Sequence, residues 1–308
     1  MTAAIMVPGL TSIIIVAADS GPLLRRCVDS VLASNAFVEV VLVDNASVDG
    51  ELERIESART NDPRLHVLRN GTNIGFGAAC NKGAAMARGD VLVILNPDCE
   101  VQPTFVCDLR SGIDAAADIG LLGVTVCEPN GTPARGNRRR DPTLRRVLAS
   151  ITGLARLQSR WPACAGVEMP AWIGPPPSIE SVEAVEAVAG ACMALPRRVF
   201  ERLHGFDEGY FLHAEDLDLC RRVRDAGFRV VIAHALRVIH ACGSSSRHRA
   251  LFVARHKHRG MWRYFCKFDP AARNGVVRLL VRVGLWVHFT AALPGLAWRK
   301  LRVIIESG

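Results

Sequence analysis

Residues 39–47, EVVLVDNAS, decide the fold class of this 308-residue chain, because a short apolar, β-branched run ends abruptly in acidic and amide side chains. Such a run is typical of a strand that is buried on both faces of a parallel sheet. Helical patterns separate it from four similar runs, at residues 11–16, 65–68, 91–95 and 121–126. The alternation predicts an α/β protein with a doubly wound, mostly parallel central sheet and flanking helices.

The segments between these runs have the apolar spacing of helices, and several begin with Pro or Asp near the first turn. We expect helices over residues 22–34, 49–59, 75–87 and 103–117. Further along the chain, we expect helices at 197–203 and 215–226, followed by a strand that begins at residues 229–233.

Residues 128–181 break this alternation. They hold six arginines between Arg135 and Arg146 and three consecutive prolines at 175–177. This composition predicts an insertion or a mobile surface segment. Apolar patterning resumes at residues 182–195.

The overall composition is that of an ordinary globular protein, with 49% hydrophobic and 22% charged residues, which excludes wholesale disorder. Ten scattered cysteines without a Cys-x-x-Cys pair predict reduced core residues, a cytoplasmic location and no structural zinc site. The first residues lack the features of a signal peptide.

The positive charge gathers at the end of the chain. Residues 241–308 hold thirteen lysines and arginines against Asp269 and Glu306, whereas the net charge of the whole chain is only +8. A basic surface of this kind indicates an anionic partner, such as a phospholipid face, a diphosphate or nucleic acid, or else a solvated face.

The apolar segment from Val276 to Trp298 contains Arg278, Arg282, His288 and Pro294, so we expect that it does not span a membrane. It is predicted either to lie in the membrane interface as an amphipathic helix or to pack on the domain as a terminal helix.

Short polar residues follow the predicted strands: Asp44 and Asn45 after the second, Asn73 after the third, and Asn96 and Asp98 after the fourth. Parallel strands bring these loops to one edge, where such side chains bind ribose, base edges or a divalent ion, although they also serve as turn and capping residues. A P-loop, a dinucleotide fingerprint and a Gly-x-Ser-x-Gly elbow are absent, which weighs against kinases, dehydrogenases and α/β-hydrolases.

A second group lies near the end of the predicted domain. Glu215 and Asp216 begin a helix, where a carboxylate acts either as a general base or only as a cap. His240 follows an apolar strand, and a lone histidine there is either a metal or diphosphate ligand or a structural residue.

The motifs SIIIV, VVLVDNASVDG, NIGFGAACNKGA and GDVLVILNPD, followed by GFDEGYFLHAEDLDLC and RVIHACGSSS, closely resemble those of the inverting family 2 nucleotide-sugar glycosyltransferases. The LNPD form and the segment RHKHRGMWRYFCKF are most similar to the rhamnosyltransferase branch of this family. The resemblance covers most of residues 11–268 outside the insertion.

The resemblance implies a GT-A fold. Its nucleotide-binding half would be residues 1–127, its insertion 128–181 and its acceptor-binding half 182–240. A basic helical extension, residues 241–308, would follow and possess a surface suited to an anionic membrane.

The resemblance also implies roles for single residues. Asp216 would be the catalytic base and Glu215 its neighbour, Asp98 would be the metal-binding acid, and His240 would approach the metal or the diphosphate. Gly190 and Ala191 would line the donor sugar and the acceptor. The remaining nucleotide-sugar positions are Ala17, Asp19, Asp44, Asn45, Asn73, Gly75 and Asn96. The family usually has Thr-Tyr-Asn where this chain has Ala17-Ala18-Asp19, and an acid where it has Asn96.

The implied activity is transfer of L-rhamnose from dTDP-rhamnose, with Mg²⁺ or Mn²⁺, to a saccharide or polyprenyl-diphosphate-linked acceptor in cell-envelope polysaccharide synthesis. The enzyme would be cytoplasmic and peripheral on the inner face of the membrane. The alternatives are a UDP-hexose or UDP-N-acetylhexosamine donor and a non-catalytic nucleotide- or carbohydrate-binding module. Nucleic acid is not an expected partner, because the basic region lacks a recognition motif or stacked-aromatic platform.

Overall fold

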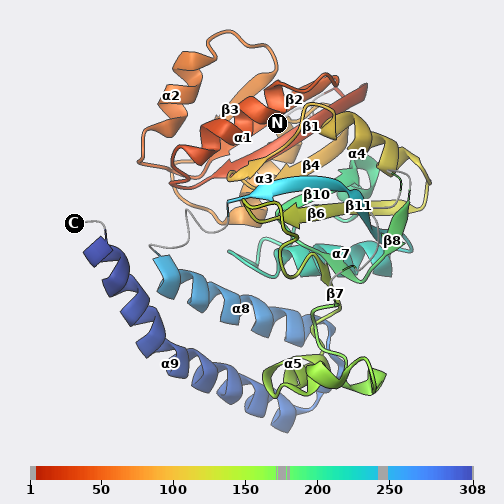
Figure 1. Ribbon diagram of the computed structural model, residues 1–308, viewed down its shortest axis with the longest axis vertical. Coiled ribbons are helices and arrows are strands. Elements are labelled where there is room, and N and C mark those ends of the chain that lie inside the picture. Colours follow the sequence, from red (N-terminus) through yellow and green to blue (C-terminus); the bar gives the residue numbers. More distant parts are fainter. Residues whose placement is uncertain (1–4, 171, 173–177, 179–180, 242–248, 307–308) are drawn as a thin grey trace.

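The structure, a computed structural model, describes residues 5–170, 172, 178, 181–241 and 249–306. Its described part is built on a nine-stranded sheet in the order β3-β2-β1-β4-β10-β6-β11-β5, with β8 paired to β11 (Figure 1). The strands are β1 (Val7–Ala17), β2 (Val38–Asp44), β3 (Leu65–Arg69), β4 (Gly89–Leu95), β5 (Cys99–Glu100), β6 (Ile119–Cys127), β8 (Val182–Ala184), β10 (Cys192–Pro196) and β11 (Arg229–His240). The mostly parallel α/β sheet that the sequence predicts is confirmed.

Three strands of the described sheet run against the others, and one of them is β8, which is antiparallel to β11. β10 is antiparallel to both of its neighbours, β4 and β6, and the short β5 is antiparallel to β11. The apolar run at residues 182–195 indicated extended structure here, but an apolar pattern carries no information on strand direction. β11 begins at Arg229 and reaches His240, as the apolar strand expected before this histidine predicts, and its pairing with β6 has a register shift between Ala233 and Arg237.

Helices cover both faces of the sheet, because the strands carry apolar side chains on both faces and these must be shielded from water. In β1, Ile13 and Ile15 face one hydrophobic cluster, whereas Ile14 and Val16 face the other. The first cluster includes side chains of α1 (Leu23–Leu32), α2 (Glu51–Ala58) and α4 (Phe105–Asp114). The second includes side chains of α3 (Phe76–Met86), α6 (Arg197–Arg202) and α7 (Glu215–Asp225).

The predicted insertion contains regular elements of its own. β7 (Arg138–Arg139) pairs with β9 (Ala187–Val188) in a separate two-stranded sheet. Beyond β7 come α5 (Leu144–Ile151) and the 3-10 helices η1 (Leu154–Leu157) and η2 (Pro162–Cys164). The pairing of β7 with β9 therefore fixes the start of the insertion beside the second half of the domain.

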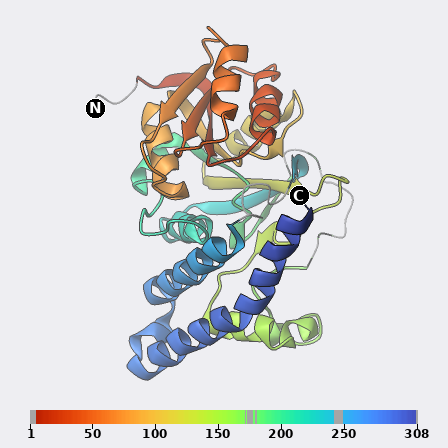
Figure 2. The ribbon, with the colours of Figure 1, turned by 90° about the vertical axis from the view of Figure 1, so that its left-hand side faces the viewer.

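The chain ends in two long helices, α8 (Ala250–Phe268) and α9 (Gly275–Glu306), joined by η4 (Pro270–Arg273). Figures 1 and 2 show that these helices and α5 extend from the sheet at the end of the molecule opposite β2 and β3. Tyr264 of α8 is buried and donates to Asp141 Oδ1 at 3.0 Å, so α8 packs on the domain.

α9 packs mainly on α8. His288 Nδ1 lies 2.8 Å from His258 Nε2, and the guanidinium of Arg282 lies 5.7 Å from the centre of the Trp262 ring. Within the described chain, Gly275–Gly295 is a segment of sufficient length and apolar character to cross a membrane, and none of it is buried.

Candidate active site

The loops that follow β1, β2 and β4 meet at one edge of the sheet, because these three strands are parallel. Ala17 and Asp44 stand opposite each other at the ends of β1 and β2, and the backbone N–H of Asn45 donates to the Ala17 carbonyl at 2.8 Å. The Asp44 side chain is buried and accepts from the Ser47 backbone N–H at 3.1 Å. Three residues predicted to bind the nucleotide sugar thus lie together.

The predicted asparagines connect two of these loops. Asn45 Nδ2 donates to Asn73 Oδ1 at 3.1 Å and to the Gly75 carbonyl at 3.2 Å. Asn45 Oδ1 accepts from Asn70 Nδ2 at 3.1 Å, and Asn73 Oδ1 accepts from the Gly75 N–H at 3.0 Å. The amides of Asn45 and Asn73 therefore hold the loop before α3 against the loop after β2.

Asp19 connects the first loop to its surroundings. Its φ is +52°, and its Oδ1 accepts from the Val48 backbone N–H at 2.8 Å. Its Oδ2 pairs with Arg249 Nη2 at 2.6 Å, immediately before α8. The carboxylate expected beside the nucleoside thus also joins the C-terminal helices to the sheet.

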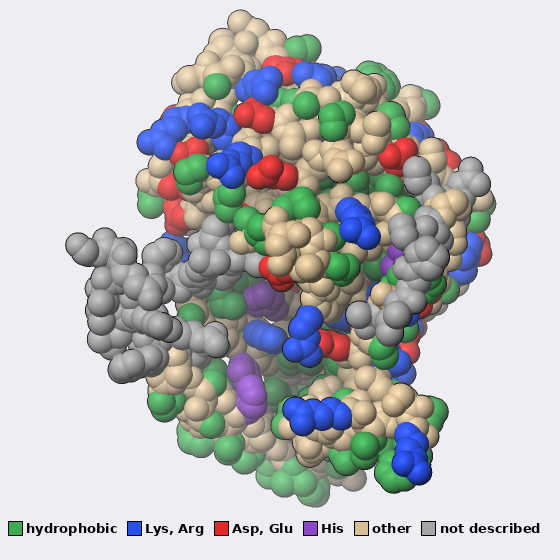
Figure 3. Space-filling view, viewed as in Figure 1, with side chains coloured by type: hydrophobic (Ala, Val, Ile, Leu, Met, Phe, Trp, Pro, Cys, Tyr) green, Lys and Arg blue, Asp and Glu red, His purple; other side chains and the backbone are tan. Residues whose placement is uncertain are grey.

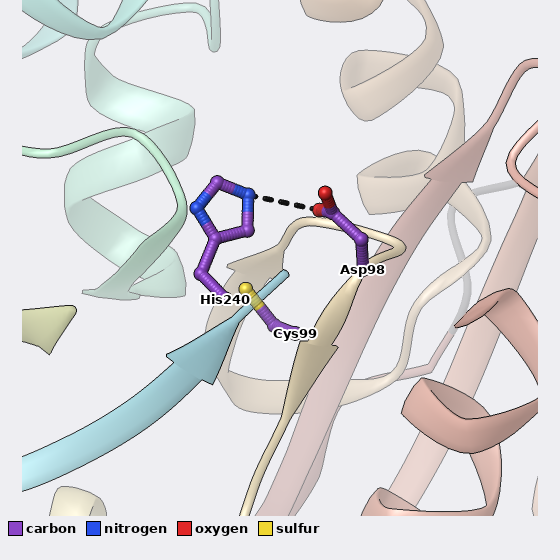
Figure 4. Close-up of side chains that lie close together, drawn as sticks. All are labelled: Asp98, Cys99 and His240. Carbon is purple, nitrogen blue, oxygen red and sulfur yellow. Dashed lines mark ion pairs between the residues drawn. The ribbon is translucent and has the colours of Figure 1, made fainter. Parts of the chain in front are cut away.

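Asp98 and His240 lie together in an arrangement that fits a metal ion, and we refer to this pair as the metal corner. β5 and β11 pair in antiparallel register with His240 opposite Cys99, and the Ala241 N–H donates to the Asp98 carbonyl at 3.0 Å. This pairing brings His240 Nε2 to 2.9 Å from Asp98 Oδ1, and Figure 4 shows the two side chains pointing toward each other. Asn96 Nδ2 lies 3.4 Å from the same histidine nitrogen.

The donor atoms of this corner suit Mg²⁺ or Mn²⁺ bound together with a diphosphate. One carboxylate and one imidazole leave most coordination positions to diphosphate and water oxygens, which these ions prefer. Cys99 Sγ also lies within 4.8 Å of the other two ligand atoms. Its thiol is fully buried and contacts the Ala191 carbonyl at 3.7 Å, and burial raises its pKa well above the usual value, so it stays protonated.

The acidic pair begins α7, after a tight turn in which His213 and Ala214 have φ values of +67° and +73°. Glu215 is only 6% exposed, and among the described residues no hydrogen-bond donor reaches its Oε2. Burial, followed by the negative charge of Asp216, raises the pKa of Glu215 to about 8. The structure thus distinguishes a buried, protonated Glu215 from Asp216, whose side chain is 14% exposed, and both residues line one cavity.

Gly190 and Ala191 lie between the acidic pair and the metal corner. A Cβ atom on Gly190 would lie 3.1 Å from Asp216 Oδ2, so only glycine leaves this space open. The Ala191 carbonyl accepts from the Asn96 N–H at 2.9 Å. The predicted sugar-binding segment therefore touches both groups.

A cavity of about 1380 Å³ is lined by Asn96, His240, Gly190, Glu215 and Asp216. Its lining does not include Asp98 or the predicted nucleotide-sugar residues of the loops after β1, β2 and β3. In Figure 3 the surface is hollowed between the sheet and the end of the molecule that carries α5, and basic and histidine side chains lie in this hollow. The cavity wall also carries basic residues from other elements, namely Arg135, Arg139, Arg156 and Lys257.

Sequence reasoning missed Arg139. Its Nη1 lies 3.2 Å from Asp216 Oδ2, and its Nε donates to the Gly136 carbonyl at 2.9 Å. The pairing of Arg139 with Ala187 in the β7–β9 sheet fixes this position. The only sequence signal was the density of arginines between 135 and 146, which does not indicate which of them reaches the site.

Comparisons with known proteins identify the family and the fold of this chain. The family model described as "Glycosyl transferase family 2" matches residues 12–171. The chain is 27% identical over 274 residues to the Mycobacterium tuberculosis protein named "N-acetylglucosaminyl-diphospho-decaprenol L-rhamnosyltransferase", covering 82% of this chain and 86% of that protein.

Two solved structures share the fold at 19% identity. One is the mannosyltransferase PcManGT from Pyrobaculum calidifontis in complex with GDP-Man and Mn²⁺, with a TM-score of 0.57 over 97% of this chain and 75% of that one. The other is GalNAc-T7 with UDP, GalNAc and Mn²⁺, with a TM-score of 0.56 over 78% of this chain. The alignment spans less than half of the GalNAc-T7 chain, 44% of its length.

Proposed function

Because this chain belongs to glycosyl transferase family 2, we propose that it is an inverting rhamnosyltransferase. The donor would be dTDP-rhamnose, and the acceptor a hydroxyl of a saccharide carried on polyprenyl diphosphate, in cell-envelope polysaccharide synthesis. The observation that supports this most is the cavity lined by both Asp216 and His240, whose Nε2 lies 2.9 Å from Asp98 Oδ1. The name of the M. tuberculosis relative supports L-rhamnose as the transferred sugar and a polyprenyl-diphosphate-linked saccharide as the acceptor.

The proposed reaction is a single displacement. Asp216 accepts the proton of the acceptor hydroxyl while the hydroxyl oxygen attacks the anomeric carbon of the sugar. The bond from that carbon to the diphosphate oxygen breaks, so the nucleoside diphosphate leaves from the opposite face and the configuration inverts. Asp98 and His240 would hold Mg²⁺ or Mn²⁺, which when bound supplies positive charge for the diphosphate.

Arg139 would position the base in this reaction. A guanidinium 3.2 Å from Asp216 Oδ2 limits the directions in which the carboxylate can turn. The protonated Glu215 beneath it adds no second negative charge to the acceptor side of the cavity.

We propose that the enzyme works on the cytoplasmic face of the membrane as a peripheral protein. Thirteen lysines and arginines in residues 241–308 support this, since each contributes about 1 kcal/mol near anionic lipid. Co-sedimentation with anionic liposomes should be weaker for a chain that ends near Lys267 than for the full chain, and equal binding would refute a role for α9.

The deciding experiment is Asp216→Asn. We expect the variant to bind dTDP-rhamnose with the wild-type affinity but to lose at least about a thousandfold in transfer, because the amide cannot accept the proton. Calorimetry measures binding, and release of dTDP measures turnover. Asp225→Asn, the same change at the exposed end of α7, should leave both unchanged.

Retained turnover in Asp216→Asn would refute the assignment of the base. In the same calorimetric series, UDP-glucose and UDP-N-acetylglucosamine are compared with dTDP-rhamnose, each with and without Mg²⁺. Preference for a UDP-sugar would overturn the proposed donor and keep the mechanism. Absence of binding for all three donors would favour a non-catalytic module.

A further inference from the structure

The segment of α5 and η1, residues 144–161, has two different sides. One side lines the catalytic cavity through Val147, Gly153, Ala155 and Arg156. The other exposes large apolar side chains, which are 41–56% accessible: Leu148, Leu154, Leu157 and Trp161. Ile151 is 65% accessible and also belongs to the cavity lining. The same short segment therefore belongs both to the site and to an apolar surface.

α9 presents a second apolar surface. Its inner residues Val277, Val281, Leu285 and Phe289 recur every four positions and are partly buried. The opposite side of the helix exposes Val276, Leu279, Leu280, Val283, Trp286 and Val287, each at least 48% accessible. A helix that packs its inner side on α8 has no need of an apolar outer side in water.

These two surfaces lie at the same end of the molecule. The Leu144 N–H, at the start of α5, donates to Asp269 Oδ2 at 2.7 Å, in the connection between α8 and α9. Both views of the ribbon show α5 beside the hairpin of α8 and α9, away from β2 and β3 (Figures 1 and 2).

The charges around these surfaces have one sign. Residues 144–167 contain four arginines and no acidic residue, and residues 270–305 also lack acidic residues. Apolar side chains among arginines suit a bilayer that contains anionic lipid, where the apolar groups enter the acyl boundary and the arginines face phosphates. A second copy of the chain fits less well, because a two-fold interface would place arginines against arginines.

We propose that α5, η1 and α9 form a bilayer-docking surface, and that the segment 144–161 is the wall along which a polyprenyl-diphosphate acceptor reaches Asp216. The polyprenyl chain would stay in the bilayer beside Leu148, Leu154 and Leu157, while Arg156 would bind the diphosphate inside the cavity. The path of the acceptor rests on the proposed function, whereas the docking of the protein on a bilayer rests on the exposed apolar and basic surface alone.

The first test replaces the exposed apolar residues. The triple variant Leu148→Ser, Leu154→Ser, Leu157→Ser alters exposed residues outside the cavity lining. It is compared with a control, Ile5→Ser, Met6→Ser, Phe37→Ser, which alters exposed apolar residues at the other end of the molecule. Two acceptors are used: polyprenyl diphosphate N-acetylglucosamine in vesicles of phosphatidylcholine and phosphatidylglycerol, and a water-soluble short-alkyl diphosphate N-acetylglucosamine.

We expect the α5–η1 variant to lose about tenfold or more in vesicle flotation and in transfer to the vesicle acceptor, and to keep its rate on the soluble acceptor. The control variant should behave as wild type in all three. A wild-type rate of the α5–η1 variant on vesicles would overturn the proposal. So would unchanged flotation with a shift from dimer to monomer in light scattering, which would identify a second copy as the occupant.

The second test concerns the diphosphate. Arg156→Gln should raise KM for the soluble acceptor about fivefold with little change in KM for the donor. Arg160→Gln, a nearby exposed arginine outside the cavity lining, is the control. Equal acceptor KM values in the two variants would overturn the role of Arg156. If wild type transfers to neither acceptor, the proposed function fails, and flotation alone then decides the docking surface.

Discussion

Among the site carboxylates, Glu215 combines deep burial with a raised pKa. It is 6% exposed, its Oε2 lacks a hydrogen-bond donor within the described chain, and its pKa is raised to about 8 by burial and by Asp216. In the unfolded chain the same group ionises near its ordinary pKa of 4.5. Between these two values the folded state binds more protons than the unfolded state, so this group makes stability fall as pH rises.

Glu215→Gln should remove this loss. The wild type loses stability as Glu215 ionises, whereas the variant does not. We therefore expect the difference in unfolding free energy between variant and wild type to grow by about 2 kcal/mol from about pH 6 to pH 9, since each pKa unit corresponds to about 1.4 kcal/mol. Urea unfolding across this range measures it. Glu201→Gln, on a side chain that is 62% exposed, should follow the wild-type curve. Parallel curves for Glu215→Gln and wild type would contradict the burial argument.

At the scale of elements, the junction between β3 and α3 depends on a close approach of two backbones. Gly75 has a φ of +91°, and a Cβ atom there would lie 2.7 Å from the Phe211 carbonyl oxygen. The Phe76 N–H donates to that same oxygen at 2.9 Å. The start of α3 is thus joined directly to the turn that precedes the acidic pair.

Gly75→Ala should lower the unfolding free energy by about 3 kcal/mol. The positive φ strains the backbone of alanine, and the new methyl group collides with the Phe211 carbonyl oxygen, so the two costs are summed. Gly227→Ala has a nearly equal φ of +88° but meets no atom within 4 Å, so it should cost only about 1 kcal/mol. Denaturant unfolding compares the two variants. Equal losses would show that the contact with Phe211 contributes nothing.

The type and approximate position of the longer helices and strands could be predicted from the sequence, whereas the two-residue strands could not. The strand expected at residues 39–43 is β2 (Val38–Asp44), and the helix expected at 215–226 is α7 (Glu215–Asp225). β5 and β7 have two residues each, too few for any periodicity to reveal. These two strands nevertheless bring His240 to Asp98 and Arg139 to Asp216.

At the scale of the whole molecule, Asp141 connects three parts of the chain. Its carboxylate pairs with Arg221 and Arg224 of α7 and accepts from the Tyr264 hydroxyl of α8, while Asp141 itself belongs to the insertion. The side chain is buried, so these contacts are only weakly screened by solvent. This residue therefore couples the insertion, α7 and the C-terminal helices.

Asp141→Asn should lower the unfolding free energy by about 2 to 3 kcal/mol, since it leaves two arginines without their buried partner. Thermal and urea unfolding measure the loss. Asp225→Asn also removes a partner of Arg221, but from a 50% exposed carboxylate, and should cost less than about 0.5 kcal/mol. A loss for Asp141→Asn as small as that for Asp225→Asn would contradict the coupling.

The sequence by itself determined the fold class, the family resemblance and the residues of the two site groups, because apolar periodicity and contiguous motifs such as LNPD and AED are local properties of the chain. Only the tertiary structure decided that His240 meets Asp98, that Arg139 meets Asp216 and that Glu215 is buried. These contacts join residues up to 142 positions apart through two-residue strands and a turn. Protonation state and proximity depend on such packing, and no local pattern encodes it.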